Sequence, residues 1–223
     1  MIDSAGRNCP MPLDCFLTIA DGADEQLILL KTLNPVWEEV LGDLYLEMHE
    51  KKWEVYVVTD LDPQAWPSGK GEILAGLNPE VISRYRERYG ENWSEPCLRD
   101  FQEQIREYEK IRRELDQLLD RLKQEIGLSE SEAISPEFMT ELEQKLPEDL
   151  RQKEKELRQK AYAYIGRVSV EVGDVVTFPA LQVHSLQHGI RVIEFQTPHY
   201  ERLIVMFAQK VLTQNHWDTD RAM

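Results

Sequence analysis

The chain has 223 residues, of which 41 are acidic and 26 are lysine or arginine, so its formal net charge at pH 7 is −15. This length is enough for one sizeable hydrophobic core. The acidic balance argues against nucleic acid or an anionic membrane as the main partner, although local basic groups can still bind a small anion. Three widely spaced cysteines give neither a disulfide framework nor a zinc-type pairing. No apolar run has the length to span a bilayer, and the N-terminus lacks the pattern of a signal peptide, so we expect a reducing cytoplasm.

Residues 1–80 are predicted to be rich in β-strands. The strongest signal is Trp53–Leu61, where aromatic and β-branched residues dominate. Shorter apolar runs at Leu27–Leu33 and Val40–His49 are also expected to hold strands. A loop rich in proline and glycine follows the Trp53–Leu61 strand.

Residues 81–165 carry a helical pattern instead. Between residues 101 and 126, apolar side chains recur in steps of three and four, which defines one face of a long helix. These side chains are Phe101, Ile105, Tyr108, Ile111, Leu115, Leu118, Leu122 and Ile126. A short helix and a final charged helix from Glu148 to about Tyr164 should complete an antiparallel hairpin. The apolar face could pack on the rest of the chain or on a second copy, which leaves a homodimer open.

Strand-like patterns return in residues 166–223, in the segments RVSVEVGDVVTFPA, IRVIEFQT and RLIVMFAQKVL. Neither β region is large enough to bury both of its faces alone. We therefore expect the two regions to form one sheet system, with the helical region inserted between them.

Four side chains in the two β regions could bind a metal ion. Glu47 and His49 are two residues apart, so on a strand they share a face. A tight return would bring Glu54 beside them, and His184 would arrive from the second β region. Two imidazoles with two carboxylates suit a divalent ion such as zinc, iron, manganese or cobalt.

The same residues carry a resemblance to the cupin superfamily. Glu47-x-His49-x₄-Glu54 resembles the first cupin motif, in which two ligands two residues apart precede a glutamate. The glycine, proline and histidine of Gly173–His184 keep the spacing of the second motif, although Leu181 occupies a position that is usually glycine.

This resemblance implies a mainly β cupin-type barrel (jelly roll) with a large α-helical insertion between the two motifs. Residues 1–80 would form the first half of the barrel and residues 81–165 the insertion. Residues 166–223 would form the second half and the C-terminal tail.

Within the cupins, the chain resembles type I mannose-6-phosphate isomerases. Their ligands lie in Gln-x-His, in Lys-x-Glu and after Pro-Ala. Here Glu47 takes the glutamine position, Lys52-Trp53-Glu54 matches Lys-x-Glu, and FPALQVHSL matches the last element. The resemblance implies a zinc site, carbohydrate metabolism, and aldose–ketose isomerisation of a sugar or sugar phosphate. It also implies catalytic roles for Lys52, Glu194 and Arg202, the last of which lies two residues closer to the Glu-x-Gln element than is usual.

Two other functions compete with isomerisation. Cupins with an iron site and open coordination positions oxidise small molecules, so a metal-dependent oxygenase is one alternative. A non-catalytic cupin that binds a sugar or a protein partner is the other. The added charge of Glu47 and the shifted position of Arg202 favour this second alternative.

Overall fold

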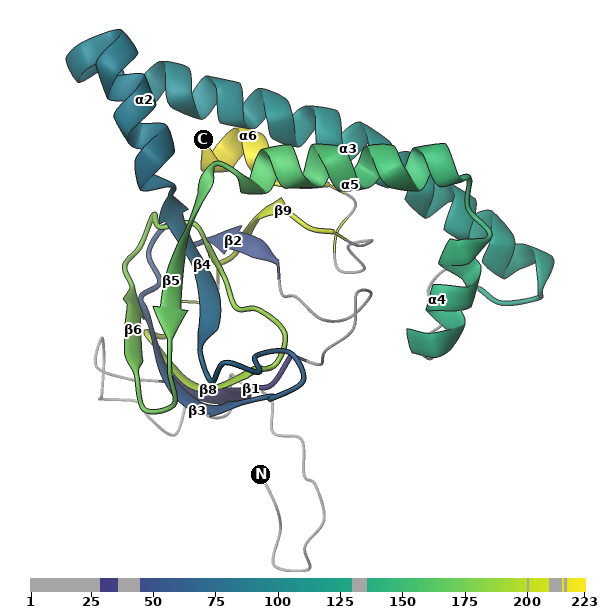
Figure 1. Cartoon of the computed structure of the whole chain (residues 1–223), viewed down its shortest axis with the longest axis horizontal. Coiled ribbons are helices and arrows are strands. Elements are labelled where there is room, and N and C mark those ends of the chain that lie inside the picture. The colour runs from purple at the N-terminus through teal and green to yellow at the C-terminus, as the bar shows by residue number, and fades with distance from the viewer. Residues whose placement is uncertain (1–28, 36–44, 130–135, 200, 209–213, 215) are drawn as a thin grey trace, which may run out of the picture.

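Two antiparallel sheets and a layer of helices make up the part of the chain described by this computed structural model, which is residues 29–35, 45–129, 136–199, 201–208, 214 and 216–223 (Figure 1). Both short apolar runs expected to hold strands near the N-terminus begin outside these residues. The strands are β1 (Leu29–Leu33), β2 (Leu46–Met48), β3 (Glu54–Leu61), β4 (Gly71–Leu77), β5 (Ile165–Val170), β6 (Val175–Phe178), β7 (His184–Ser185), β8 (Ile190–Gln196) and β9 (Leu203–Met206).

Both β regions of the sequence contribute to both sheets. The four-stranded sheet has the order β1-β8-β3-β6, and the five-stranded sheet has the order β5-β4-β7-β2-β9. Strands that precede the helices therefore lie between strands that follow them, which confirms the expectation of a shared sheet system. Within the described residues, hydrogen-bonded pairing stays inside each sheet, so the strands form two layers and the barrel is not closed.

The two sheets share an apolar cluster at one end of the space between them. The alternation of β3 turns Tyr56 and Val58 toward this space, where both are 1% exposed. They pack with side chains from both sheets, namely Leu61, Ile73, Val170, Phe178, Leu186, Ile190 and Val192. Because period-two strands bury alternate residues, the intervening Val55 and Val57 lie on the outer side of the four-stranded sheet.

Helices occupy the middle of the chain. They are α2 (Pro79–Tyr89), the 3₁₀ turn η2 (Gly90–Asn92), α3 (Ser94–Glu125), α4 (Pro136–Gln144) and α5 (Glu148–Tyr162), and the short α6 (Thr219–Ala222) ends the chain. Helix α5 runs back alongside α3 (Figure 1). None of the helices in the described residues is both long enough and apolar enough to cross a membrane.

The long helix follows its predicted face only in part. It starts earlier than the apolar pattern, at Ser94, because Pro96 lies in the first turn, where proline is tolerated. The predicted positions are buried as far as Leu115, after which burial moves by one residue to Leu119 and Lys123. The expected last member, Ile126, is 46% exposed because the helix ends at Glu125.

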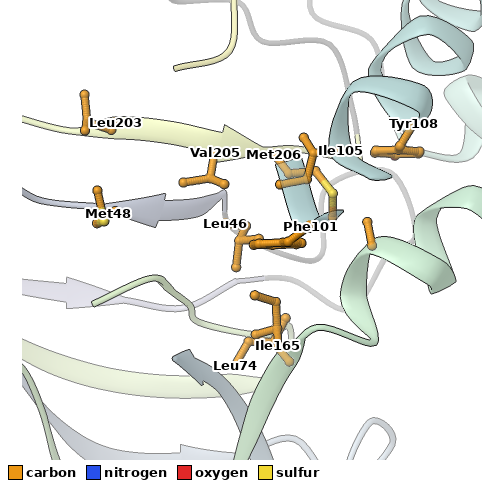
Figure 2. Packing of buried hydrophobic residues seen from close by; sticks show 11 residues of the cluster. Leu46, Met48, Leu74, Phe101, Ile105, Tyr108, Ile165, Leu203, Val205 and Met206 are labelled. Carbon is orange, nitrogen blue, oxygen red and sulfur yellow. The ribbon is translucent and has the colours of Figure 1, made fainter. Parts of the chain in front are cut away.

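The principal core lies between α3 and the five-stranded sheet. Figure 2 shows Phe101 and Ile105 of α3 among Leu46, Val205 and Met206 of β2 and β9. All five are completely buried. A fully buried side chain of this kind contributes roughly 1.5–3 kcal/mol through removal of apolar surface from water. This contact anchors β2, which carries Glu47 on its other face.

Candidate metal centre and cavity

Strand β2 directs Glu47 into the space between the sheets. Leu46 and Met48 are buried in the core with α3, so the residue between them must point the opposite way. Glu47 is paired with His184 of β7 on one side and with Ile204 of β9 on the other. A two-residue strand from the second β region is thus placed directly beside the first predicted ligand.

The two histidines are oriented in the same manner. Nδ1 of His49, one residue beyond β2, lies 2.9 Å from the backbone oxygen of Glu201. Nδ1 of His184 lies 3.0 Å from the backbone oxygen of Gln182. A carbonyl oxygen can only accept, so each Nδ1 donates, and a ring that is neutral therefore has its lone pair on Nε2. Metal-binding histidines are commonly held this way.

Glu54 lies between the two Nε2 atoms. Its Oε2 is 3.0 Å from Nε2 of His184, and its Oε1 is 3.3 Å from Nε2 of His49. Lys52 Nζ is 2.5 Å from Oε1, and the Tyr56 hydroxyl donates to Oε2 at 3.0 Å. Burial alone would raise the pKa of Glu54, but the contacts with His184, His49 and Lys52 outweigh it and hold that pKa far below its usual range. Glu54 is therefore an ionised carboxylate in a buried position.

The four predicted metal ligands converge. Glu47, His49 and His184 can each place a ligand atom within 4.8 Å of the others, and Glu54 contacts both histidines. Among the described residues, His49 Nε2 is buried without a hydrogen-bond partner, although it lies 3.3 Å from Oε1 of Glu54. Burial acts to lower the pKa of His184, and the contact with Glu54 outweighs this and raises it. An ionised carboxylate only accepts, so without an ion the Nε2 of His184 donates to Glu54 at 3.0 Å. Once that proton is lost, both imidazoles and both carboxylates direct lone pairs toward one point, so the donor set fits a divalent metal.

The predicted catalytic residues lie around the same point. Lys52 is in the loop before β3 rather than on the strand, yet its ammonium still reaches Glu54. Glu194 on β8 is 2% exposed and accepts from Lys31 Nζ at 2.8 Å. Arg202 Nε lies 3.9 Å from Glu47 Oε2, and its guanidinium stacks over the Tyr45 ring. Their catalytic roles stay predictions.

These groups face a cavity of about 470 Å³. Its lining combines carboxylates, cationic groups, amides and a tyrosine, namely Lys31, Leu33, Tyr45, Glu47, Lys52, Glu54, Glu194, Gln196, Glu201, Arg202 and Gln214. A second cavity of about 310 Å³ lies among α3, α4 and α5 and contains none of the predicted site residues. The polar cavity between the sheets is therefore the candidate site.

Among the residues that sequence reasoning missed, Lys31 and Glu201 make charged contacts within this site. Lys31 lies between Leu30 and Thr32, which are both exposed, so strand alternation could have placed it inside. The side chain of Glu201 accepts from the backbone N–H groups of Lys51 and Lys52, at 2.6 and 2.7 Å. Burial opposes these bonds, but they lower the pKa of Glu201. No sequence signal indicates this contact, because about 150 residues separate the partners.

Comparisons with known proteins give structural likenesses only. No protein-family model matches the chain, and no curated protein matches its sequence. A mannose 6-phosphate isomerase from Bacillus subtilis is 13% identical to this chain, with a TM-score of 0.38. The match covers 80% of this chain and 36% of that enzyme. A variant of phosphomannose isomerase from Salmonella typhimurium is 11% identical with a TM-score of 0.43, covering 99% and 61%. A zinc-bound mannose 6-phosphate isomerase is 12% identical with a TM-score of 0.40, covering 92% and 55%. The chain thus spans between about one third and three fifths of the length of these enzymes, and TM-scores below 0.5 do not place it in their family.

Proposed function

We propose that this chain is a metal-dependent cupin that catalyses aldose–ketose isomerisation of a sugar or sugar phosphate. The observation that carries the proposal is the convergence of Glu47, His49, Glu54 and His184 beside a polar cavity. These four residues would hold the ion. Zinc suits the nitrogen and oxygen donors best, with manganese, iron and cobalt as alternatives.

The charges of the cavity fit an anionic ligand once the metal is present. Four carboxylates and three cationic side chains line the cavity. A divalent ion would therefore leave the lining with a net positive charge. Lys52, Lys31 and Arg202 are the groups that we assign to the negatively charged oxygens of a phosphate or of a sugar in reaction.

Isomerisation needs a group that moves a proton between adjacent carbon atoms. A bound divalent ion would polarise the carbonyl oxygen and stabilise negative charge on it. We assign the proton transfer to Glu194, which is buried in the cavity wall. Burial and the charge of Glu54 raise the pKa of Glu194, and the ion pair with Lys31 opposes that rise. A raised pKa brings a carboxyl group closer to the neutral range in which general bases work best.

One observation favours a non-catalytic binding protein as the second candidate. Arg202, the proposed anion-binding residue, is already held by the Tyr45 ring and lies 3.9 Å from Glu47. Because Glu47 stands where the resembling enzymes have a neutral glutamine, this contact offsets the added charge. It also restrains a guanidinium that a catalytic cycle would use.

Elemental analysis of the purified protein tests the metal site first. We expect about one zinc or manganese ion per chain, and loss of that metal in His49→Ala and His184→Ala. The matched control is His216→Ala, because the His216 side chain is 70% exposed and lies 3.3 Å from Asp218, outside the cavity lining. The His216→Ala variant should keep the metal.

Turnover then separates the candidate functions. Conversion of mannose 6-phosphate to fructose 6-phosphate, lost in Glu194→Gln, would support the isomerase. Saturable sugar binding without turnover would support the binding protein instead. Iron in the purified protein, with oxygen uptake, would support an oxygenase. A folded protein that stays empty after incubation with divalent ions would contradict all metal-dependent functions.

A further inference from the structure

Among the residues that the structure describes, the carboxamide of Gln196 is buried without a hydrogen-bond partner. Gln196 is the last residue of β8 and is 2% exposed. Its side chain lies on the inner face, with the other buried residues of the strand, and its backbone is in register with Glu54 of β3. Within the described residues, neither Nε2 nor Oε1 has a partner.

An amide in this state is costly to the folded chain. Burying an unpaired polar group loses its hydrogen bonds to water and gains none in return. At the other end of β8, Ile190 and Val192 lie on the same inner face, and both are apolar and fully buried. An apolar residue at position 196 would therefore fold at least as well. Because Gln196 also lines the cavity, the missing partner can come from a bound molecule.

The free atoms of Gln196 restrict what that molecule is. Oε1 needs a donor, and Nε2 needs an acceptor. Inorganic phosphate at neutral pH and simple carboxylates mainly accept, so they satisfy only half of the amide. A hydroxyl group both donates and accepts. The nearby carboxylates Glu54 and Glu194 also accept donors from a ligand.

We infer that Gln196 is a specificity-determining residue that binds a hydroxyl group of a polyhydroxylated ligand in the cavity. This inference rests on the proposed sugar-binding function but not on turnover. It assigns Gln196 to the hydroxyl-bearing part of the ligand, while the cationic side chains serve its anionic part. The site would therefore discriminate sugar phosphates from phosphate alone.

The test compares the wild-type protein with the Gln196→Met variant, both loaded with zinc. Methionine keeps the shape of the side chain but lacks the amide. Calorimetric titrations use mannose 6-phosphate and inorganic phosphate as probes. We expect the variant to bind mannose 6-phosphate about 10- to 100-fold more weakly and to bind phosphate as the wild type does. Without ligand, its midpoint of thermal unfolding should rise by about 2–4 °C, since an unpaired buried amide is gone. The control Gln152→Met changes an exposed residue on α5 and should alter neither quantity.

Three results would overturn the inference: equal affinity of variant and wild type for mannose 6-phosphate, equally weaker binding of both probes, or a lower unfolding temperature in the variant. Wild-type protein that prefers neither mannose 6-phosphate nor fructose 6-phosphate over phosphate would overturn it as well. Should Gln196→Met fail to fold, Gln196→Asn withdraws the amide by one methylene and should weaken sugar-phosphate binding alone. Selective binding that depends on Gln196, with no turnover, would refute the isomerase and leave this inference standing.

Discussion

The five-stranded sheet separates two interiors of opposite character. On its helix-facing side, Leu46 and Met48 pack against α3 in a core without unpaired side-chain groups among the described residues. On its other side, the intervening Glu47 faces a cavity that Gln196 also lines, and among the described residues Gln196 and the nearby His49 have buried side-chain atoms without hydrogen bonds. Neighbouring residues on one short strand thus serve two purposes. Stability gained on one face permits an unfavourable arrangement on the other, which is the pattern expected at a functional site.

The largest effect should come from the helix-facing side. Phe101→Ala removes a completely buried ring and should lower the free energy of unfolding by about 3–5 kcal/mol. Urea denaturation measures this loss. The control Phe195→Ala removes a ring that is 36% exposed on the other sheet, so it should cost much less. Protein of Phe101→Ala that is still folded should bind metal normally, and loss of the metal from it would show that the two interiors are coupled.

Buried polar groups on the helix-facing side are paired with each other, so removing one partner should lower the free energy of unfolding. Tyr108 donates to Glu154 Oε1 at 2.8 Å, and Arg158 lies 3.2 Å from the same oxygen. Glu154→Ala would leave the buried Tyr108 hydroxyl unpaired and should cost about 1–3 kcal/mol of unfolding free energy. Tyr108→Phe leaves Glu154 with Arg158 and should cost only about 1 kcal/mol. Equal losses would argue against pairing as the cause.

A smaller effect is expected when the hydrogen bonds that position the loop after His49 are removed. Glu201→Ala removes the acceptor for the backbone of Lys51 and Lys52, next to His49. Zinc affinity, measured by competition with a chelator, should fall about 10- to 100-fold, as it does when residues that orient metal ligands are removed. The control is Glu50→Ala, whose side chain pairs with Arg221 at the surface. Equal zinc affinity in both variants would mean that Glu201 does not position the site.

The smallest effect should follow from Glu47→Gln, which removes one negative charge but keeps an oxygen ligand. Zinc affinity should fall by about tenfold, because one fewer carboxylate attracts the ion. The stability of the metal-free protein should stay the same or rise, since Glu47 no longer repels Glu54. A competition titration and a thermal melt on the same samples check both statements. Unchanged zinc affinity would show that the charge of Glu47 does not contribute to binding of the ion.

The sequence predicted those parts of the molecule in which apolar residues repeat with the period of a strand or a helix. The alternation of β3 and the helical face from Phe101 to Leu115 were correct. Beyond Leu115 the prediction drifted, because α3 leaves the sheet and packs against α4, and burial then follows a different partner. The exposed Ile126 shows that a periodic pattern does not by itself locate a helix end.

The spacing of the two motifs predicted which side chains of the candidate site lie together. It could not predict contacts between segments that are far apart in the sequence. The convergence of Glu47, His49, Glu54 and His184 follows the spacing of the two motifs. The contact of Glu201 with the loop after His49 could not be predicted, since nothing in either segment refers to the other. The unpaired state of Gln196 likewise depends on a cavity that only the packed sheets create.

The pairing of His49 with the backbone of Glu201 has a consequence for biosynthesis. Glu47, His49 and Glu54 leave the ribosome early, but His184 and the carbonyl group that orients His49 are made more than 100 residues later. A nascent chain that ends within the helices holds only an incomplete set of ligands. The proposed set of ligands can therefore be completed only after residue 184 has been made, and His49 can be oriented only after residue 201.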